Sequence, residues 1–168
     1  LLVPTRSQNL QIQEEFAAAG IPIVINDAQN YFKTTELQVM LSLLKVIDNP
    51  LQEVPLVAVL RSPIVGMTAD ELATVRLTDR QVPYYTALDE FIRNFDAETA
   101  DTVSNSAYIK LTRFQEQLTG FRALARANRL VDLIWSIYGT TGYLDFVGGM
   151  PGGPQRQANL RALYDRAH

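Results

Sequence analysis

The chain has 168 residues, of which 47% are hydrophobic and 20% charged, and its formal net charge is −3. This length allows one sizeable hydrophobic core or two small ones, and the composition is that of a soluble globular protein. Cysteine is absent, the single histidine is the last residue, and no apolar run is long enough to cross a bilayer; disulfides, thiol chemistry, cysteine or histidine metal sites and a membrane partner are therefore excluded.

The first 25 residues predict a strand, a helix and a second strand. Residues 1–5 and 22–25 are short apolar runs, and the helical segment 8–19 ends at Gly20, a residue type that favours the position just after a helix. This pattern indicates a right-handed parallel crossover, but two strands are too few for a stable parallel layer. We therefore expect a β-α-β piece whose partner strands lie in a longer polypeptide, an expectation that the missing initiator Met also favours.

From residue 35 onward the sequence predicts helices. Thr35–Gln38 has the form of a capping box, and the apolar residues that follow cover most of a helix circumference up to Asn49-Pro50, which predicts a buried helix. The polar segment 96–106 is expected to be a mobile loop. The other predicted helices cover residues 54–60, 68–77 (after a second capping box that opens at Thr68), 84–95, 107–127, 130–138 and 154–167.

Four glycines and two prolines crowd into residues 148–154. A phosphate-binding loop needs G-x-x-x-x-G-K-[ST], but Gly153 is followed by Pro154 and Gln155, so this is not an ATP site. Gly153 at the N-cap and Pro154 at the first helical position instead predict a helix start. The glycines are also a candidate hinge, which comprises Gly148, Gly149, Gly152 and Gly153.

Arg156 lies one turn into that predicted helix, on the same face as Leu160 and Leu163. Free backbone N–H groups and the helix dipole favour anions at such a helix start, which makes Arg156 a candidate phosphate contact. The alternative is an internal ion pair between Arg156 and a carboxylate that fixes the helix, and of the two we prefer the ion pair.

Aromatic and acidic residues give no catalytic signal. Trp135, Tyr138 and Tyr143 could form base-stacking platforms, but their apolar surroundings favour core packing. Paired acids such as Asp70-Glu71 and Asp89-Glu90 lack an accompanying ligand set. The sequence therefore predicts no catalytic residue and no metal site.

Two long blocks, residues 20–77 and 143–167, resemble the AddA subunit of the AddAB-type helicase–nucleases, which are called RexAB in lactic-acid bacteria. More distantly, Arg156-x-x-Asn159-Leu160 and the region around Ser62-Pro63 are similar to UvrD-type helicases of superfamily 1. The resemblance implies a mostly α fragment in which residues 1–48 open the RecA-like domain 2A, with its short β-α-β piece, and residues 49–168 form the helical insertion 2B.

The resemblance also implies what the parent does. The parent would be a cytoplasmic ATP-dependent 3′–5′ DNA helicase and exonuclease that acts in double-strand-break repair and recombination. Its cofactors would be ATP and Mg²⁺, and its partner would be the second subunit of a heterodimer. Because the Walker motifs and the nuclease domain would lie outside residues 1–168, the fragment is expected to be inactive alone and to hold no cofactor.

The resemblance carries individual residues with it. The arginine that UvrD-like helicases place near the ATP γ-phosphate aligns with Pro4, so Arg6, two residues on, is the nearest candidate nucleotide contact; bracing of the 2A edge is its alternative. The Gly-Ile-Gly segment that contacts duplex backbone aligns with Val65-Gly66-Met67, where the central glycine is kept. This alignment makes Gly66, Thr68 and the nearby Arg61 candidate DNA contacts, with a structural turn glycine and helix cap as the equal alternative.

Charge is uneven along the chain, with seven basic and fourteen acidic residues over 1–101 but eight and four over 102–168. We expect the fragment to guide duplex DNA through sequence-independent phosphate contacts. The alternative is a structural module that docks the partner subunit or the rest of the helicase without DNA contact. An open basic stripe would favour DNA and pairing with internal acids would favour docking; the residues that decide are Arg113, Arg122, Arg126, Arg129, Arg156 and Arg161.

Overall fold

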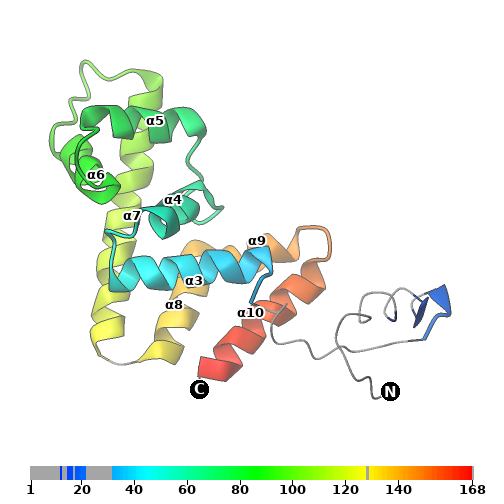
Figure 1. Cartoon of the computed structure of the whole chain (residues 1–168). Coiled ribbons are helices and arrows are strands. Elements are labelled where there is room, and N and C mark those ends of the chain that lie inside the picture. The colour runs from blue at the N-terminus through cyan, green and yellow to red at the C-terminus, as the bar shows by residue number, and fades with distance from the viewer. Residues whose placement is uncertain (1–11, 13–14, 17, 22–31, 128, 168) are drawn as a thin grey trace. The chain divides into compact units, whose positions relative to one another are not determined.

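The structure is a computed structural model that describes residues 12, 15–16, 18–21, 32–127 and 129–167 (Figure 1). The chain divides into two compact units, Leu1–Lys33 and Thr34–His168. The first described helix of the second unit therefore belongs with the helices that follow it. The domain boundary expected after residue 48 stays a prediction.

In the first unit, the described residues include the end of a helical turn. Ala19 N donates to Glu15 O at 3.0 Å and Ile21 N donates to Phe16 O at 2.9 Å, while Gly20 has φ 67°. A left-handed glycine with a hydrogen bond across it is a common way to end a helix, so the helix end predicted at Gly20 is confirmed. The two predicted strands and Arg6 lie outside the described residues, and the β-α-β piece is not shown.

The second unit is helical throughout the residues that the structure describes there, which confirms the mostly α prediction. None of these helices has the length and apolar content that a membrane span requires. The helices are α3 (Thr35–Asp48), α4 (Glu53–Arg61), α5 (Ala69–Thr78), α6 (Tyr84–Arg93), α7 (Thr102–Arg126), α8 (Leu130–Thr141), α9 (Tyr143–Gly148) and α10 (Gly153–Ala167).

Helix α7 is the spine of this unit (Figure 1). Helices α5 and α6 pack against its first half, α3 packs across it, and α8 returns along its second half. Its buried side chains recur every three or four residues and so form one continuous stripe: Ala107, Leu111, Phe114, Leu118 and Phe121. The core of the unit therefore follows one face of α7 along most of its length.

Two predicted boundaries need correction. Helix α7 begins at Thr102, five residues before the predicted start, because the Asp101 carboxylate accepts a hydrogen bond from Ser104 N at 2.7 Å and caps the helix. The segment expected to be a mobile loop is therefore helical over its last five residues. The capping box predicted at Thr35 is also wrong, since α3 begins at Thr35 itself and Thr34, its N-cap, makes no side-chain capping bond.

The prediction that Trp135 packs in the core is wrong as well. Trp135 is 58% exposed, whereas Tyr138 and Tyr143 are 4% and 3% exposed. Helix α8 buries the face that carries Ile134 and Tyr138, and Trp135 lies outside that face. Its ring meets the Tyr164 ring of α10 with centroids 5.5 Å apart, so it packs at the rim of the α8–α10 contact.

Candidate nucleic-acid interface

The loop between α4 and α5, residues 62–68, carries the candidate DNA contacts Gly66 and Thr68. Ser62 Oγ donates to Val59 O at 2.7 Å, and Gly66 N donates to Ser62 O at 2.7 Å. Gly66 has φ 73°, a conformation that favours glycine, and the next residue, Met67, is buried. The loop is thus a tight turn with a fixed shape, as the structural alternative requires.

Thr68 caps α5 as the sequence predicts. Its hydroxyl accepts from Glu71 N at 3.2 Å, and the Glu71 carboxylate accepts from Thr68 N at 2.7 Å, so the capping box is confirmed. The N–H groups of Ala69 and Asp70 have no hydrogen-bond partner among the described residues. The start of α5 therefore offers two backbone donors to an anion, next to the carboxylate of Asp70.

Glu71 also ties this loop to α7. Its side chain is buried, and Lys110 Nζ lies 2.7 and 2.9 Å from its two oxygens while donating to Gly66 O at 2.9 Å. Ser106 Oγ donates to the same carboxylate at 2.5 Å. Burial raises the pKa of Glu71, but the hydrogen bonds from Lys110, Ser106 and Thr68 outweigh it, and the net pKa lies below the ordinary 4.5. Glu71 stays ionised and fixes Lys110.

Two exposed arginines lie beside the loop. Arg61 ends α4, and Arg113 lines a shallow cavity of about 100 Å³ together with Ile64 and Val65 of the loop. Neither guanidinium has an ion-pair partner among the described residues. Sequence reasoning placed Arg61 here, but it did not assign Arg113 to this loop, because the 48 residues between Val65 and Arg113 hide their proximity.

Arg156 makes the internal ion pair that the sequence favours. Arg156 Nη1 lies 2.8 Å from Glu36 Oε2, and Asn159 Nδ2 donates to Glu36 Oε1 at 2.7 Å. Burial raises the pKa of Glu36, but the hydrogen bonds from Asn159 and the backbone, with the Arg156 charge, bring it below the ordinary 4.5. Arg156 and Arg61 line one cavity of about 210 Å³, so the structure brings these two candidates together.

The glycine-rich turn between α9 and α10 is tightly packed. A Cβ on Gly153 would overlap the carbonyl oxygen of Gly148, and one on Gly148 would overlap the side chain of Gln157. Gly152 has φ 70° and accepts the hydrogen bond from Arg156 N, so the helix start lies one residue earlier than predicted. Gly149 has only ordinary contacts. The hinge role of the four glycines stays a prediction.

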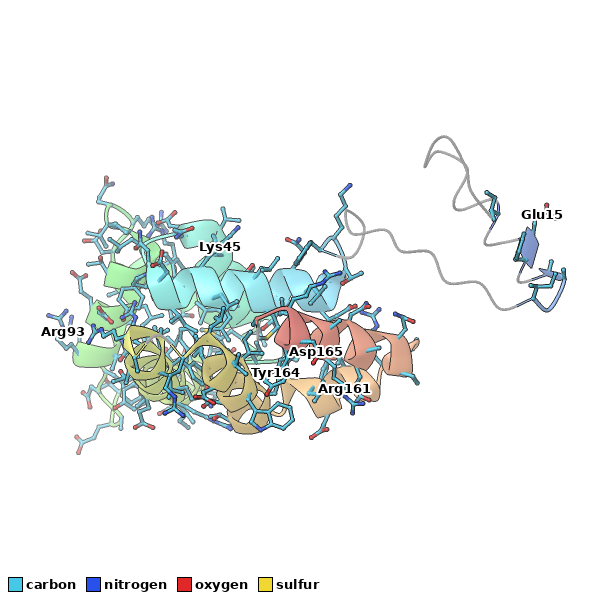
Figure 2. All side chains as sticks on the ribbon, turned by 90° about the horizontal axis from the view of Figure 1, so that it is seen from below. Glu15, Lys45, Arg93, Arg161, Tyr164 and Asp165 are labelled. Carbon is cyan, nitrogen blue, oxygen red and sulfur yellow. The ribbon has the colours of Figure 1, made fainter. Side chains whose placement is uncertain are left out.

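The other basic residues do not form one open stripe within the described chain. Arg122 donates to Ile47 O at 3.1 Å, where a cation offsets the negative end of the α3 dipole, and Arg129 pairs with Asp132. Figure 2 shows Arg161 on α10 near Asp165 and Tyr164, with Arg161 exposed. The distribution therefore combines exposed cations with internal pairs, and neither the duplex-guiding nor the docking alternative is excluded by it.

Known proteins match the chain along its whole length. The UvrD-like helicase C-terminal domain family matches residues 1–165. Curated relatives, each named as the AddA-type subunit of an ATP-dependent helicase/nuclease, include those of Ligilactobacillus salivarius (56% identical over 99% of this chain) and Lacticaseibacillus casei (58% identical over 99%). The relative of the same name from Lactiplantibacillus plantarum is 52% identical over 100% of this chain.

The chain spans only 13% or 14% of the length of these three relatives. The match nevertheless confirms the resemblance of residues 20–77 and 143–167 and extends it over the segment between them. The chain belongs to the family of UvrD-like helicase C-terminal domains.

Proposed function

We propose that this chain is part of an ATP-dependent helicase/nuclease of the AddA type and that its helical unit guides duplex DNA. The relatives at 52–58% identity carry that name. The parent enzyme would act in double-strand-break repair and recombination in the cytoplasm, together with a second subunit. ATP and Mg²⁺ would bind mainly outside these residues, with Arg6 as the one nucleotide contact proposed within them.

The observation that carries the DNA role is the fixed shape of the loop 62–68. Lys110 holds the Gly66 carbonyl and Thr68 caps α5, so the two free N–H groups of that helix start do not have to be ordered when a phosphate arrives. Arg61 and Arg113, both exposed beside this loop, supply positive charge. Contacts of this kind recognise the backbone and are indifferent to base sequence.

The test is duplex binding by the 168-residue chain, followed by fluorescence anisotropy at several salt concentrations. Replacing Arg61 and Arg113 together by Ala should weaken binding and reduce the slope of log affinity against log salt by about 2, roughly one for each lost phosphate contact. Arg161→Ala, an exposed arginine on α10, is the matched control and should leave the slope almost unchanged. Equal effects of the double variant and the control would reject this interface.

The alternative, a docking module, is favoured by one observation, which is the exposure of Trp135. An exposed tryptophan beside a tyrosine is typical of the residues that anchor protein interfaces. If Trp135→Ala abolishes association of the parent with its second subunit while the Arg61/Arg113 variant binds duplex normally, docking is the better description.

The proposed hinge at residues 148–153 is tested separately. Replacing Gly149 and Gly152 by Ala in the parent should slow unwinding more than it slows DNA-stimulated ATP hydrolysis, because only unwinding requires the helical unit to reorient. Equal loss of both activities would count against a hinge.

A further inference from the structure

We infer that Glu36 acts as a latch that holds α10 closed against α3 and so sets the angle at the glycine-rich corner between α9 and α10. The inference rests on the hinge of the proposed function but concerns its regulation. Residues 36, 156 and 159 that form the latch are close in space although 120 or more positions separate the carboxylate from its partners.

Glu36 spends both carboxylate oxygens on α10. Oε2 binds Arg156 at 2.8 Å and Oε1 binds Asn159 at 2.7 Å, and the Glu36 side chain is 2% exposed. Arg156 Nε also donates to Pro151 O at 3.1 Å, within the turn itself. One arginine therefore connects the first turn of α3 to the corner that would have to bend.

Few apolar contacts hold α10 in place otherwise. Of its 15 residues, only Gly153, Leu160 and Leu163 are buried. The remaining ties that the structure describes are polar, such as Tyr138 Oη donating to Leu160 O at 2.7 Å. A helix with so little buried apolar surface is drawn from the least stable part of a fold, so the ion pair has a large share in keeping it seated.

The corner has both a pivot and space. Gly149 makes no close contact and Gly152 already has a left-handed backbone, so the turn can change its torsion angles there. The cavity of about 210 Å³ lies directly against the latch and is lined by Glu36 and Arg156 on one side and Phe146 and Met150 on the other. Release of Glu36 therefore leaves room for the corner to move.

Glu71 provides a matched comparison for this idea. It is equally buried and ionised, and it binds a cation from a later helix, but its partner Lys110 lies in the middle of the packed spine α7. Loss of charge at Glu71 should loosen the loop 62–68 without affecting α10.

The experiment is hydrogen–deuterium exchange, resolved by peptide, on the 168-residue chain without DNA. Glu36→Gln should speed exchange in residues 153–167 by about tenfold or more, the factor expected when a hydrogen bond to a charged group is lost, and leave α4–α7 unchanged. Glu71→Gln should show the converse pattern.

An Arg156→Lys variant, which keeps the charge but loses the planar guanidinium, should fall between wild type and Glu36→Gln. Unchanged exchange in α10, or equal acceleration in every helix, would overturn the latch. Asn159→Ala, which removes one of the two bonds, replaces Glu36→Gln if that variant fails to fold. Because no DNA is present, a failure of the duplex-guiding proposal would not alter this result, and the reverse also holds.

Discussion

Glu36 and Glu71 present the same chemistry in two regions of one molecule. Each lies in the first turn of a helix and is 2% or 3% exposed. Each binds a cation from a later helix, Arg156 at 2.8 Å and Lys110 at 2.7 Å. In both, bonds to the ionised form outweigh the cost of burial, so the pKa lies below its ordinary value.

The two carboxylates differ in what else they serve. Glu71 also closes a capping box on its own helix, whereas Glu36 gives both oxygens to α10 and leaves α3 without a side-chain cap. A local motif shows which bonds a side chain can make to its neighbours. It does not show whether a partner from a distant helix takes those oxygens instead.

The glycines beside the two carboxylates should give the largest contrast. Gly153→Ala places a methyl group against the Gly148 carbonyl, where backbone must move, and should cost about 3 kcal/mol of unfolding free energy. Gly66→Ala meets only open space but keeps a left-handed backbone, and should cost about 1 kcal/mol. Urea denaturation measures both. Gly139→Ala, within α8 and without close contacts, is the control and should be neutral or slightly stabilising.

Removing the charge at either carboxylate should cost about 2 kcal/mol, because each makes several hydrogen bonds that strengthen in the ionised form. Glu36→Gln and Glu71→Gln are therefore expected to shift the urea midpoint by similar amounts. If Glu36→Gln proves much the milder, the α3–α10 contact depends on apolar packing more than on the ion pair.

Acid should weaken both regions in the same sense. A folded-state pKa below the ordinary 4.5 means that the stability from Glu36 and Glu71 is complete above pH 4.5 and is lost as the pH falls through the lower folded value. The urea midpoint should thus fall between pH 7 and about pH 3. Asp89, whose pKa burial raises, acts in the opposite sense and is common to all variants.

The Glu36→Gln/Glu71→Gln double variant isolates the two glutamates from every other acid. Its urea midpoint should change less with pH than that of the wild type. The same pH dependence in both proteins would assign the acid sensitivity to other groups.

The smallest expected contrast concerns the two predicted capping boxes. Thr68→Ala removes a hydroxyl that accepts from Glu71 N and should cost about 1 kcal/mol. Thr35→Ala, at an exposed first helical position, should change stability by less than about 0.5 kcal/mol. Thermal unfolding monitored by circular dichroism compares them, and similar losses would indicate that Thr35 has a role that its geometry does not reveal.

Local signals account for what could be predicted from the sequence. Apolar spacing and helix breakers predicted α4, α5 and α8 nearly to their ends, and the Thr68 box and Gly20 were recognisable because a cap involves residues only a few positions apart. The early start of α7 could have been inferred from Asp101, a good N-cap residue.

The site depended on contacts that no local pattern contains. The proximity of Arg113 to Val65 and the pairing of Glu36 with Arg156 are set by how α3, α7 and α10 cross. Trp135 was misplaced because an apolar run does not reveal which side of a helix the core occupies. The ion pair of Arg156 could be named as an alternative, but its acidic partner could not.

Helix α7 has a mechanical consequence. Its 25 residues give a rod about 37 Å long, which is stiff because a stripe of buried side chains supports it. Lys110, near one end, grips the loop 62–68, and Arg122, near the other, grips the end of α3. A push received at the loop would therefore reach α3 as a displacement of a single strut, with little of it absorbed as bending on the way.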